Sequence, residues 1–245
     1  MLAFILRRLI QAVIVMVTVA FISFMLFQYV GDPVVFMLGQ DATPEQVREL
    51  RASLGLDQPF IVQFWHFLAN AAQGEFGLSL RQGAKVSGLI AERFPATLEL
   101  ALVAAFLALA LGVPMGVYAA LKRGTFTSQL FMTLSLLGVS LPTFLIGILL
   151  ILVFAVTLGW FPSFGRGEVV QMGWWSTGLL KAKGWHHITL PAITLAIFQL
   201  TLIMRLVRAE MLEVLRTDYI KFARARGLSD RAIHFGHALK NTLVP

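Results

Sequence analysis

Residues Leu100–Leu121 read LALVAAFLALALGVPMGVYAAL and include no charged side chain. About 20 consecutive apolar residues are enough for a helix to cross the hydrocarbon core of a bilayer. Three further long apolar stretches occur, at Leu9–Val30, Leu130–Leu158 and Leu190–Val207. The sequence therefore predicts an all-α, polytopic membrane helix bundle with four spans.

The composition of the whole chain agrees with a membrane protein. Of its 245 residues, 58% are hydrophobic and 13% are charged, whereas soluble domains have about 45–50% apolar and about 25% charged residues. The stretch Leu130–Leu158 is longer than one span needs and contains Pro142. Proline removes a helical hydrogen bond, so we expect either a kinked, tilted helix or a span that begins late in this stretch.

The N-terminus has two interpretations. Arg7 and Arg8 followed by an apolar run are compatible with a cleavable secretory signal. The run from Leu9 is too long for a typical signal, and Gly31-Asp32-Pro33 does not resemble a small-residue cleavage site. We therefore expect a retained first span. The chain has no cysteine, which excludes a disulfide framework and a thiolate metal site.

The positions of the basic residues predict orientation, because Lys and Arg are retained on the cytoplasmic side of a membrane. Arg7 and Arg8 place the N-terminus inside, and Lys122 and Arg123 lie on the turn after the second span. The tail after Val207 is also basic; its Lys and Arg residues are Arg208, Arg216, Lys221, Arg224, Arg226, Arg231 and Lys240. The formal charge of +7 is thus explained by basic residues in the predicted cytoplasmic segments. Nucleic-acid binding is a poor second interpretation of this charge.

Two segments are predicted to be outer loops. In residues 31–96 we expect short helices: Thr43 can cap a helix that has Pro44 at its first position and stops at Gly55. Phe60–Leu68 is too short to span and should lie at the membrane interface or pack on the bundle. The second loop, 159–188, is rich in glycine and tryptophan. Tryptophan near span ends usually anchors a helix at the interface, and direct substrate contact is the alternative.

The tail is predicted to form two short helices. Thr217 or Asp218 can cap the first helix, Gly227 supplies a left-handed stop, and Ser229 can cap a second helix that runs toward Lys240. Four residues share one face of the first helix at helical spacing: Tyr219, Phe222, Ala223 and Arg226. Such a face, edged with cations, suits either anionic lipid headgroups or a groove in a cytoplasmic partner.

The same tail resembles a known family. Asp218–Ser229, DYIKFARARGLS, followed by His237–Asn241, HALKN, and Pro245, is similar to the EAA loop of bacterial ABC importer permeases in its peptide-transporter form. Four earlier stretches support the resemblance: LGLDQP at 54–59, GEFGLS at 74–79, PATLE at 95–99 and LGWFP at 158–162. The similarity to the dipeptide, oligopeptide and glutathione permeases, the binding-protein-dependent transport inner membrane components, runs from the first residue to the last.

This sequence departs from the general loop pattern in two places. Lys221, Phe222 and Ala223 stand where the general pattern has Glu-Ala-Ala, and Pro245 follows Gly227 at a greater distance. Both departures are what the peptide subfamily leads one to expect, although they leave the missing glutamate's role unassigned. Members of the family usually carry two further spans after this loop, so the resemblance implies a chain truncated before two more spans.

The resemblance implies a fold, a division of the chain and a function. The fold is the ABC importer type I permease fold. The domains are the cytoplasmic N-terminus and first span (1–30), the outer loop (31–96) and the permease core (97–245), which contains the cytoplasmic coupling loop 209–245. The function is that of a transmembrane permease subunit that forms half of the translocation pathway of an ATP-driven peptide importer, for dipeptides, oligopeptides or glutathione. Import of a nickel or other metal chelate is the alternative within the family.

The implied partners supply what this chain lacks. No Gly-Lys dipeptide occurs, and so no phosphate-binding loop with its lysine; ATP would be bound by partner subunits, and this chain would hold no cofactor. The partners are two cytoplasmic ATPases, a second homologous permease, an extracytoplasmic substrate-binding protein and the lipid bilayer of a bacterial inner membrane. The resemblance assigns ATPase docking to Tyr219, Lys221, Phe222, Ala223, Arg224, Ala225, Gly227 and Leu228.

Other functions find less support in the sequence. His234 and His237 could share a metal at i, i+3, but no carboxylate stands at matching spacing. Neither HExxH nor GxSxG occurs, so we assign no catalytic or metal residue to a membrane-bound enzyme. Arg205 and Arg208 are expected to snorkel to the inner interface and not to bind substrate. A simple membrane anchor would leave the two-helix tail unexplained.

Overall fold

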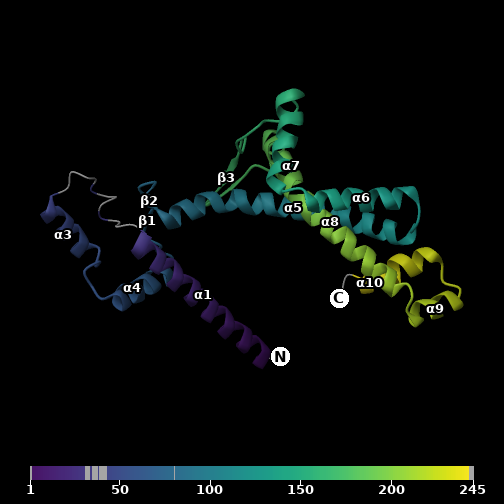
Figure 1. The fold of residues 1–245 in the computed structure, drawn as a ribbon, viewed down its shortest axis with the longest axis horizontal. Coiled ribbons are helices and arrows are strands. Elements are labelled where there is room, and N and C mark those ends of the chain that lie inside the picture. The colour runs from purple at the N-terminus through teal and green to yellow at the C-terminus, as the bar shows by residue number, and fades with distance from the viewer. Residues whose placement is uncertain (1, 31–33, 35–37, 39–42, 80, 243–245) are drawn as a thin grey trace. The chain divides into compact units, whose positions relative to one another are not determined.

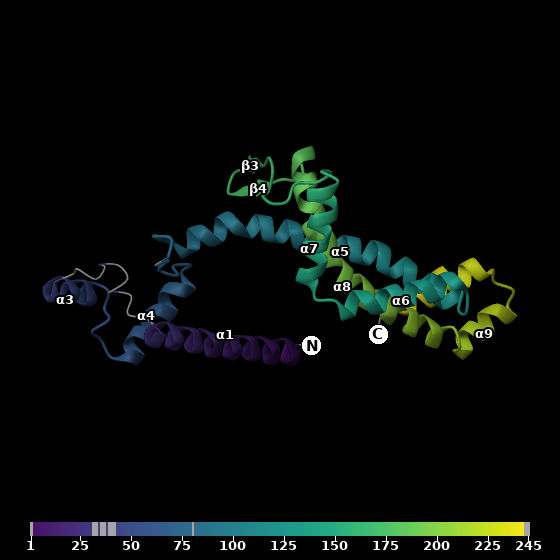
Figure 2. The same ribbon diagram turned by 45° about the horizontal axis from the view of Figure 1, so that its top comes forward.

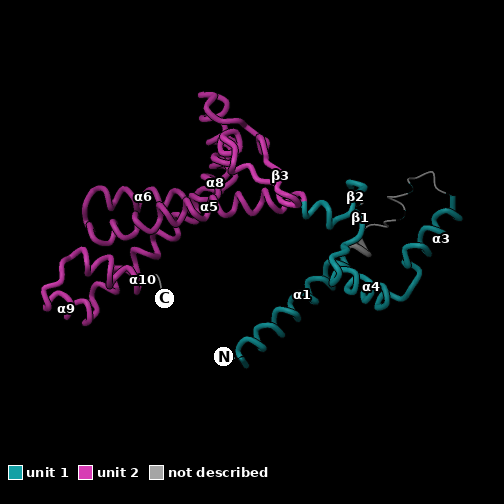
Figure 3. Tube along the Cα trace, turned by 180° about the vertical axis from the view of Figure 1, so that it is seen from behind, with its two compact units in different colours: residues 1–91 teal, residues 92–245 magenta. Residues whose placement is uncertain are grey.

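The computed structural model describes residues 2–30, 34, 38, 43–79 and 81–242. The sequence arguments based on Gly31–Pro33 and on Pro245 lie outside the described residues. The chain divides into two compact units, residues 1–91 and 92–245 (Figure 3).

The first unit contains three described helices and a small hairpin. Its elements are α1 (Leu2–Val30), α3 (Pro44–Ser53), α4 (Phe60–Ala72), β1 (Leu78–Ser79) and β2 (Ala84–Lys85), the two strands being antiparallel. At α3, the Thr43 hydroxyl accepts from the Gln46 N–H while the Gln46 side chain accepts from the Thr43 N–H. This capping box, with Gly55 at φ +68° after the helix, confirms the short helix predicted there.

Helix α4 packs on the first span. Phe21 and Phe24 of α1 contact Phe60 and Phe64 of α4, with ring centroids 5.2–5.7 Å apart. The two contacts of Phe21 are edge-to-face, an arrangement that adds to the stabilisation from apolar burial. Of the two placements expected for this segment, the aromatic contacts favour packing on the helices, while Trp65 of the same helix stays exposed.

The second unit is built on long helices. Helix α5 (Val86–Leu121) begins in the first unit and continues through the second, and α6 (Phe126–Ser140), α7 (Thr143–Leu150) and α8 (Ala182–Val214) follow. A π-helical segment, η1 (Ile151–Thr157), extends α7. Helices α6 and α7 both pack along α8 (Figure 1). Within the described residues, α1, α5 and α8 are long and apolar enough to cross a membrane, and the α6–α7 pair makes a fourth candidate.

The predicted third span is broken. Helix α6 ends at Ser140, and the axes on the two sides of the break differ by 105°. Leu141, which precedes Pro142, has ψ 134°, as the steric conflict with a following proline requires. The break thus lies at Pro142, as expected, and the bent pair is either a broken span or a re-entrant loop. Helices α5 and α8 begin at Val86 and Ala182, before the apolar stretches that start at Leu100 and Leu190. A helix can continue beyond the apolar part of its sequence, so the apolar stretch does not mark the helix start.

Small residues allow these helices to approach closely. A Cβ added to Gly116 of α5 would lie 2.7 Å from the Met204 carbonyl oxygen of α8, and one added to Gly138 of α6 would lie 2.7 Å from Thr201. Ala104 and Ala108 of α5 are buried against Ala196. Close backbone approach through glycine and alanine is the usual way in which membrane helices gain van der Waals contact.

Two smaller structures flank α8. Between η1 and α8, β3 (Val170–Met172) pairs with β4 (Trp175–Thr177) in an antiparallel hairpin that the sequence analysis did not predict. After α8 come α9 (Asp218–Ala225), the π-helical segment η2 (Ala232–Ala238) and α10 (Leu239–Thr242). The hairpin and the tail helices lie at opposite ends of α8 (Figure 2).

Candidate functional site

The first tail helix begins where expected. Thr217 occupies the N-cap position with an extended backbone, φ −68° and ψ 155°. Its hydroxyl donates backward to the Val214 carbonyl at 2.6 Å and does not cap α9. Asp218 instead lies in the first turn, where its carboxylate favours the positive end of the helix, and it pairs with Lys221 at 2.8 Å.

Gly227 ends this helix with the predicted left-handed conformation. Its φ is +76°, its N–H donates to the Arg224 carbonyl at 2.9 Å, and the Leu228 N–H donates to the Ala223 carbonyl at 3.3 Å. These two bonds form the Schellman arrangement that satisfies the last carbonyl groups of a helix. The direction in which the second tail helix leaves is therefore set at this glycine.

The second tail helix begins and is held as the sequence suggests. The Ser229 hydroxyl accepts from the Ala232 N–H at 3.3 Å, and helical structure runs from Asp230 to Thr242 with η2 inside it. Near its end, the Asn241 amide donates to the Tyr219 hydroxyl at 3.0 Å. This bond joins the second tail helix to the first.

Both tail helices share a hydrophobic core with the spans. We call this cluster the tail core; its buried members are Val117, Ala120, Val207, Met211, Ile220, Ala223, Ile233 and Ala238. They come from α5, α8, α9 and η2. Because a packed core is nearly incompressible, a push on the tail helices would be passed to the ends of α5 and α8.

Of the eight residues predicted to dock an ATPase, one is buried and seven are exposed. Ala223, expected on the same face as Phe222, is buried in the tail core. Phe222 is 63% exposed and Tyr219 is 43% exposed. The other five, Lys221, Arg224, Ala225, Gly227 and Leu228, are exposed. The buried residue beside Ala223 is Ile220, which the sequence analysis did not select.

The exposed side of α9 is an aromatic surface bordered by cations. The Arg226 guanidinium lies 5.7 Å from the Phe222 ring centroid, a cation–π contact that favours one position of the ring. Tyr219 on the same helix is a second exposed ring, and Phe235 of η2 is also exposed. Aromatic and Arg side chains are enriched in protein–protein interfaces, so this surface is a candidate docking surface.

His234 and His237 are the two residues considered above as a possible metal pair. In the part of the chain that the structure describes, no group of three or more His, Asp or Glu side chains is placed to hold a metal ion. His234 and His237 lie on η2, and the His237 carbonyl accepts from the Asn241 amide at 3.0 Å.

A buried ion pair at the other end of α8 was missed by the sequence analysis. Glu99 of α5, 5% exposed, accepts from Arg166 at 3.1 Å and from the Gly178 N–H at 3.3 Å. Arg166 also donates to the Ser176 hydroxyl at 2.7 Å. Glu99 Oε1 and Arg166 Nε are buried without a hydrogen-bond partner. Glu99 directly precedes the predicted span Leu100–Leu121, and an acid next to a long apolar stretch is a sequence signal for a specific partner.

Further contacts hold residues 159–181, which contain β3 and β4 and which we call the hairpin segment. A Cβ added to Gly184 would lie 1.9 Å from the Gly178 carbonyl oxygen, so the two backbones touch. Glu168 hydrogen-bonds to Lys183, and this bond holds the pKa of the Glu168 carboxyl below its usual value. Both side chains are well exposed, so the pair contributes little stability.

The tryptophans predicted as interface anchors differ in exposure. Trp174 is 76% exposed and Trp160 is 59% exposed. Trp175, by contrast, packs edge-on against Phe94 at 6.4 Å. The Trp185 indole donates to the Leu179 carbonyl at 2.8 Å, which fixes that ring at the start of α8.

The chain matches two models of one transport family. The model described as binding-protein-dependent transport system inner membrane component matches residues 112–245. The model of the N-terminal part of such membrane components matches residues 1–101. Together the two matches cover most of the chain.

Individual relatives align along the whole chain. A protein of Brucella suis biovar 1, named provisionally as a peptide transport system permease, is 42% identical over 246 aligned positions, which cover 100% of this chain and 76% of the relative. The glutathione transport system permease protein GsiC of Escherichia coli (strain K12) is 35% identical over 246 positions, covering 100% of this chain and 75% of the relative.

Proposed function

The chain belongs to the family of binding-protein-dependent transport system inner membrane components, and on this premise we propose that it forms half of the translocation pathway of an ATP-driven peptide importer. It is a permease subunit of an ABC importer with the helical type I fold. The proposed cargo is a dipeptide, an oligopeptide or glutathione. The names of the relatives, which refer to peptide and glutathione transport, support this class.

The observation that carries the proposed mechanism is the tail core. An aromatic, cation-bordered surface at Tyr219 and Phe222 is mounted on the same packed cluster as the ends of α5 and α8. An ATPase that held this surface would move the two spans together when it closed on ATP, as a rigid body. Gly227 would fix the angle between the two tail helices during that movement.

The remaining partners and the orientation belong to the same proposal. Two cytoplasmic ATPases would bind the ATP, a second homologous permease would complete the pathway, and a binding protein would deliver substrate from outside. The N-terminus would lie in the cytoplasm of a bacterial cell, beneath the inner membrane. Basic residues at Arg7, Arg8, Lys122 and Arg123 support this orientation.

Uptake of labelled compounds tests the cargo. Cells with the intact gene, cells with a disruption of it and disrupted cells that carry the gene on a plasmid would be supplied with a dipeptide panel and with glutathione. We expect one class of peptide to lose uptake on disruption and to regain it with the plasmid. Unchanged uptake of every compound, with the partner ATPase present, would contradict a peptide cargo and direct the same assay to metal chelates.

A further inference from the structure

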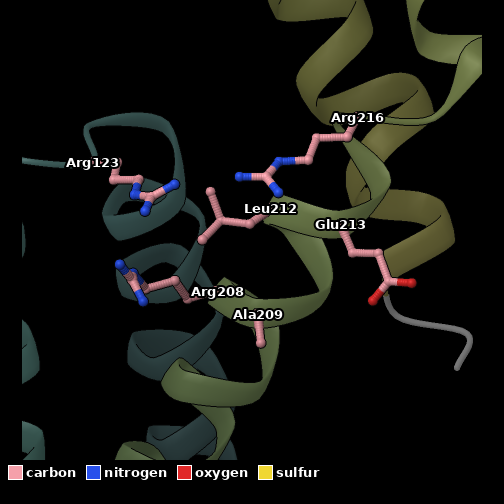
Figure 4. Close-up of a pocket in the computed structure, with 6 residues that line it drawn as sticks. All are labelled: Arg123, Arg208, Ala209, Leu212, Glu213 and Arg216. Carbon is pink, nitrogen blue, oxygen red and sulfur yellow. The ribbon is translucent and has the colours of Figure 1, made fainter.

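A basic pocket lies where two spans end. Its volume is about 530 Å³, and it is lined by Arg123, Arg208, Ala209, Leu212, Glu213 and Arg216 (Figure 4). Arg123 lies on the turn after α5, and the other five residues lie at the C-terminal end of α8 and directly after it. The pocket is thus at the level where apolar span surface gives way to polar surface.

The three arginines leave their charge available. Arg208 donates through Nε to the Ala119 carbonyl at 3.4 Å, a bond that positions the side chain without neutralising it. No ion pair joins Arg123, Arg208 or Arg216 to an acid among the residues that the structure describes. The Glu213 carboxylate points away from the three guanidinium groups (Figure 4). Unpaired cations facing one pocket attract an anion, because bringing them together in its absence costs Coulomb energy.

An apolar surface leads into this pocket. Leu202 and Leu206 are 52% and 55% exposed, and they share one face of α8 with Ala209 at spacings of four and three residues. Leu206 is one helical turn from the pocket-lining Ala209. A ligand that fits both features has an anionic head and a hydrocarbon chain.

We propose that this pocket binds an anionic phospholipid, with the headgroup phosphate held by Arg123, Arg208 and Arg216 and an acyl chain lying along Leu206 and Leu202. Arginine suits a phosphate because its planar guanidinium can give two parallel hydrogen bonds. A soluble phosphate would use the arginines alone and would leave the leucine face without a role. Basic pockets between membrane helices are known to hold lipid headgroups, and this inference does not depend on the cargo of the transporter.

The test measures lipid affinity on the purified full chain. Native mass spectrometry in detergent would give an apparent Kd for phosphatidylglycerol and for phosphatidylcholine. Each arginine near an anionic headgroup contributes about fivefold in affinity, so we expect the chain to prefer phosphatidylglycerol by about a hundredfold. Arg123→Gln with Arg216→Gln should weaken phosphatidylglycerol binding by about 25-fold. Phosphatidylcholine carries the same phosphate beside a choline cation, so its binding should weaken less, and the preference for phosphatidylglycerol should fall.

Matched variants separate the site from general charge and from folding. Arg231→Gln with Lys240→Gln removes two exposed cations outside the pocket, and we expect no change in affinity. Arg123→Lys with Arg216→Lys keeps the charge but loses the paired hydrogen bonds of the guanidinium, so its affinity should lie between that of the unaltered chain and that of the glutamine pair. Leu206→Gln should weaken both lipids while keeping the preference between their headgroups.

Three results would overturn the proposal. The first is equal affinity of the unaltered chain for the two lipids. The second is an equal loss in the control variant with Arg231 and Lys240 replaced. The third is displacement of phosphatidylglycerol by inorganic phosphate or glycerol 3-phosphate at similar concentration, which would indicate a soluble-anion site.

Discussion

At the scale of single residues, contact between backbones leaves some positions open only to glycine. Gly184, in the first turn of α8, packs so closely on Gly178 that an added Cβ would meet the carbonyl oxygen, carbon and Cα of that residue at 1.9–2.8 Å. Backbone atoms cannot rotate away as a side chain can. The hairpin segment can therefore approach α8 this closely only because Gly184 has no Cβ atom.

The replacement Gly184→Ala should destabilise the protein. Overpacking of this kind costs roughly 1–3 kcal/mol, and we expect a lower thermal midpoint for the detergent-purified chain. Gly88→Ala is the matched control, since Gly88 is also helical and a Cβ there meets nothing within 4 Å. A midpoint for Gly184→Ala equal to that of Gly88→Ala would show that the two backbones are not in contact.

At the scale of elements, one ion pair fastens the hairpin segment to α5. Glu99 receives hydrogen bonds from Arg166 and Gly178, and hydrogen bonds to a charged group contribute about 1.5–3 kcal/mol. The variant Glu99→Gln should therefore loosen residues 159–181. We expect trypsin to cleave after Lys181 about tenfold faster or more, because cleavage follows local opening.

A double variant and a control define that contribution. Arg166→Met combined with Glu99→Gln should cost less than the sum of the single changes, since the two groups are coupled. Glu92→Gln changes an exposed acid on the same helix and should leave cleavage unaltered. Strict additivity of the two single effects would mean that the pair does not hold the segment.

The angle between the tail helices depends on Gly227. A β-branched residue with φ near +76° is strained by about 1–2 kcal/mol, and no neighbouring atom within 4 Å adds a clash. Gly227→Val should insert into membranes at a normal level and should lower uptake by about tenfold or more. Gly227→Asn, which tolerates this conformation, should retain transport.

Immunoblots of membrane fractions would be measured beside uptake for these variants. Gly236→Ala serves as the control, because Gly236 is helical and has open space around its Cβ position. Full uptake by Gly227→Val would show that the turn does not transmit movement.

At the scale of the whole molecule, short-range sequence patterns predicted the spans and several helix ends but did not predict contacts between distant residues. The apolar stretches identify the spans, Thr43 and Ser229 identify helix starts, and Gly227 identifies a helix stop, because each acts through its nearest neighbours. The pairing of Glu99 with Arg166 joins residues 67 positions apart. No local pattern contains that information.

The sequence also did not predict which residues of the tail helices are buried. Helical spacing groups Ala223 with Phe222 and Arg226, yet the direction from which α5 and α8 approach decides that Ala223 is covered and Phe222 is not.

The exposed ring that results is the part of the molecule on which assembly would depend. An aromatic anchor at the centre of an interface commonly contributes about 2 kcal/mol or more, so Phe222→Ala should weaken the association with the ATPase by about 30-fold. Copurification from detergent extracts, quantified over a range of ATPase concentrations, would measure this change. Phe164→Ala removes a ring that is 88% exposed in the segment before α8 and should have no effect on this association. If the two variants retained the ATPase equally, the docking surface would have to lie elsewhere on the chain.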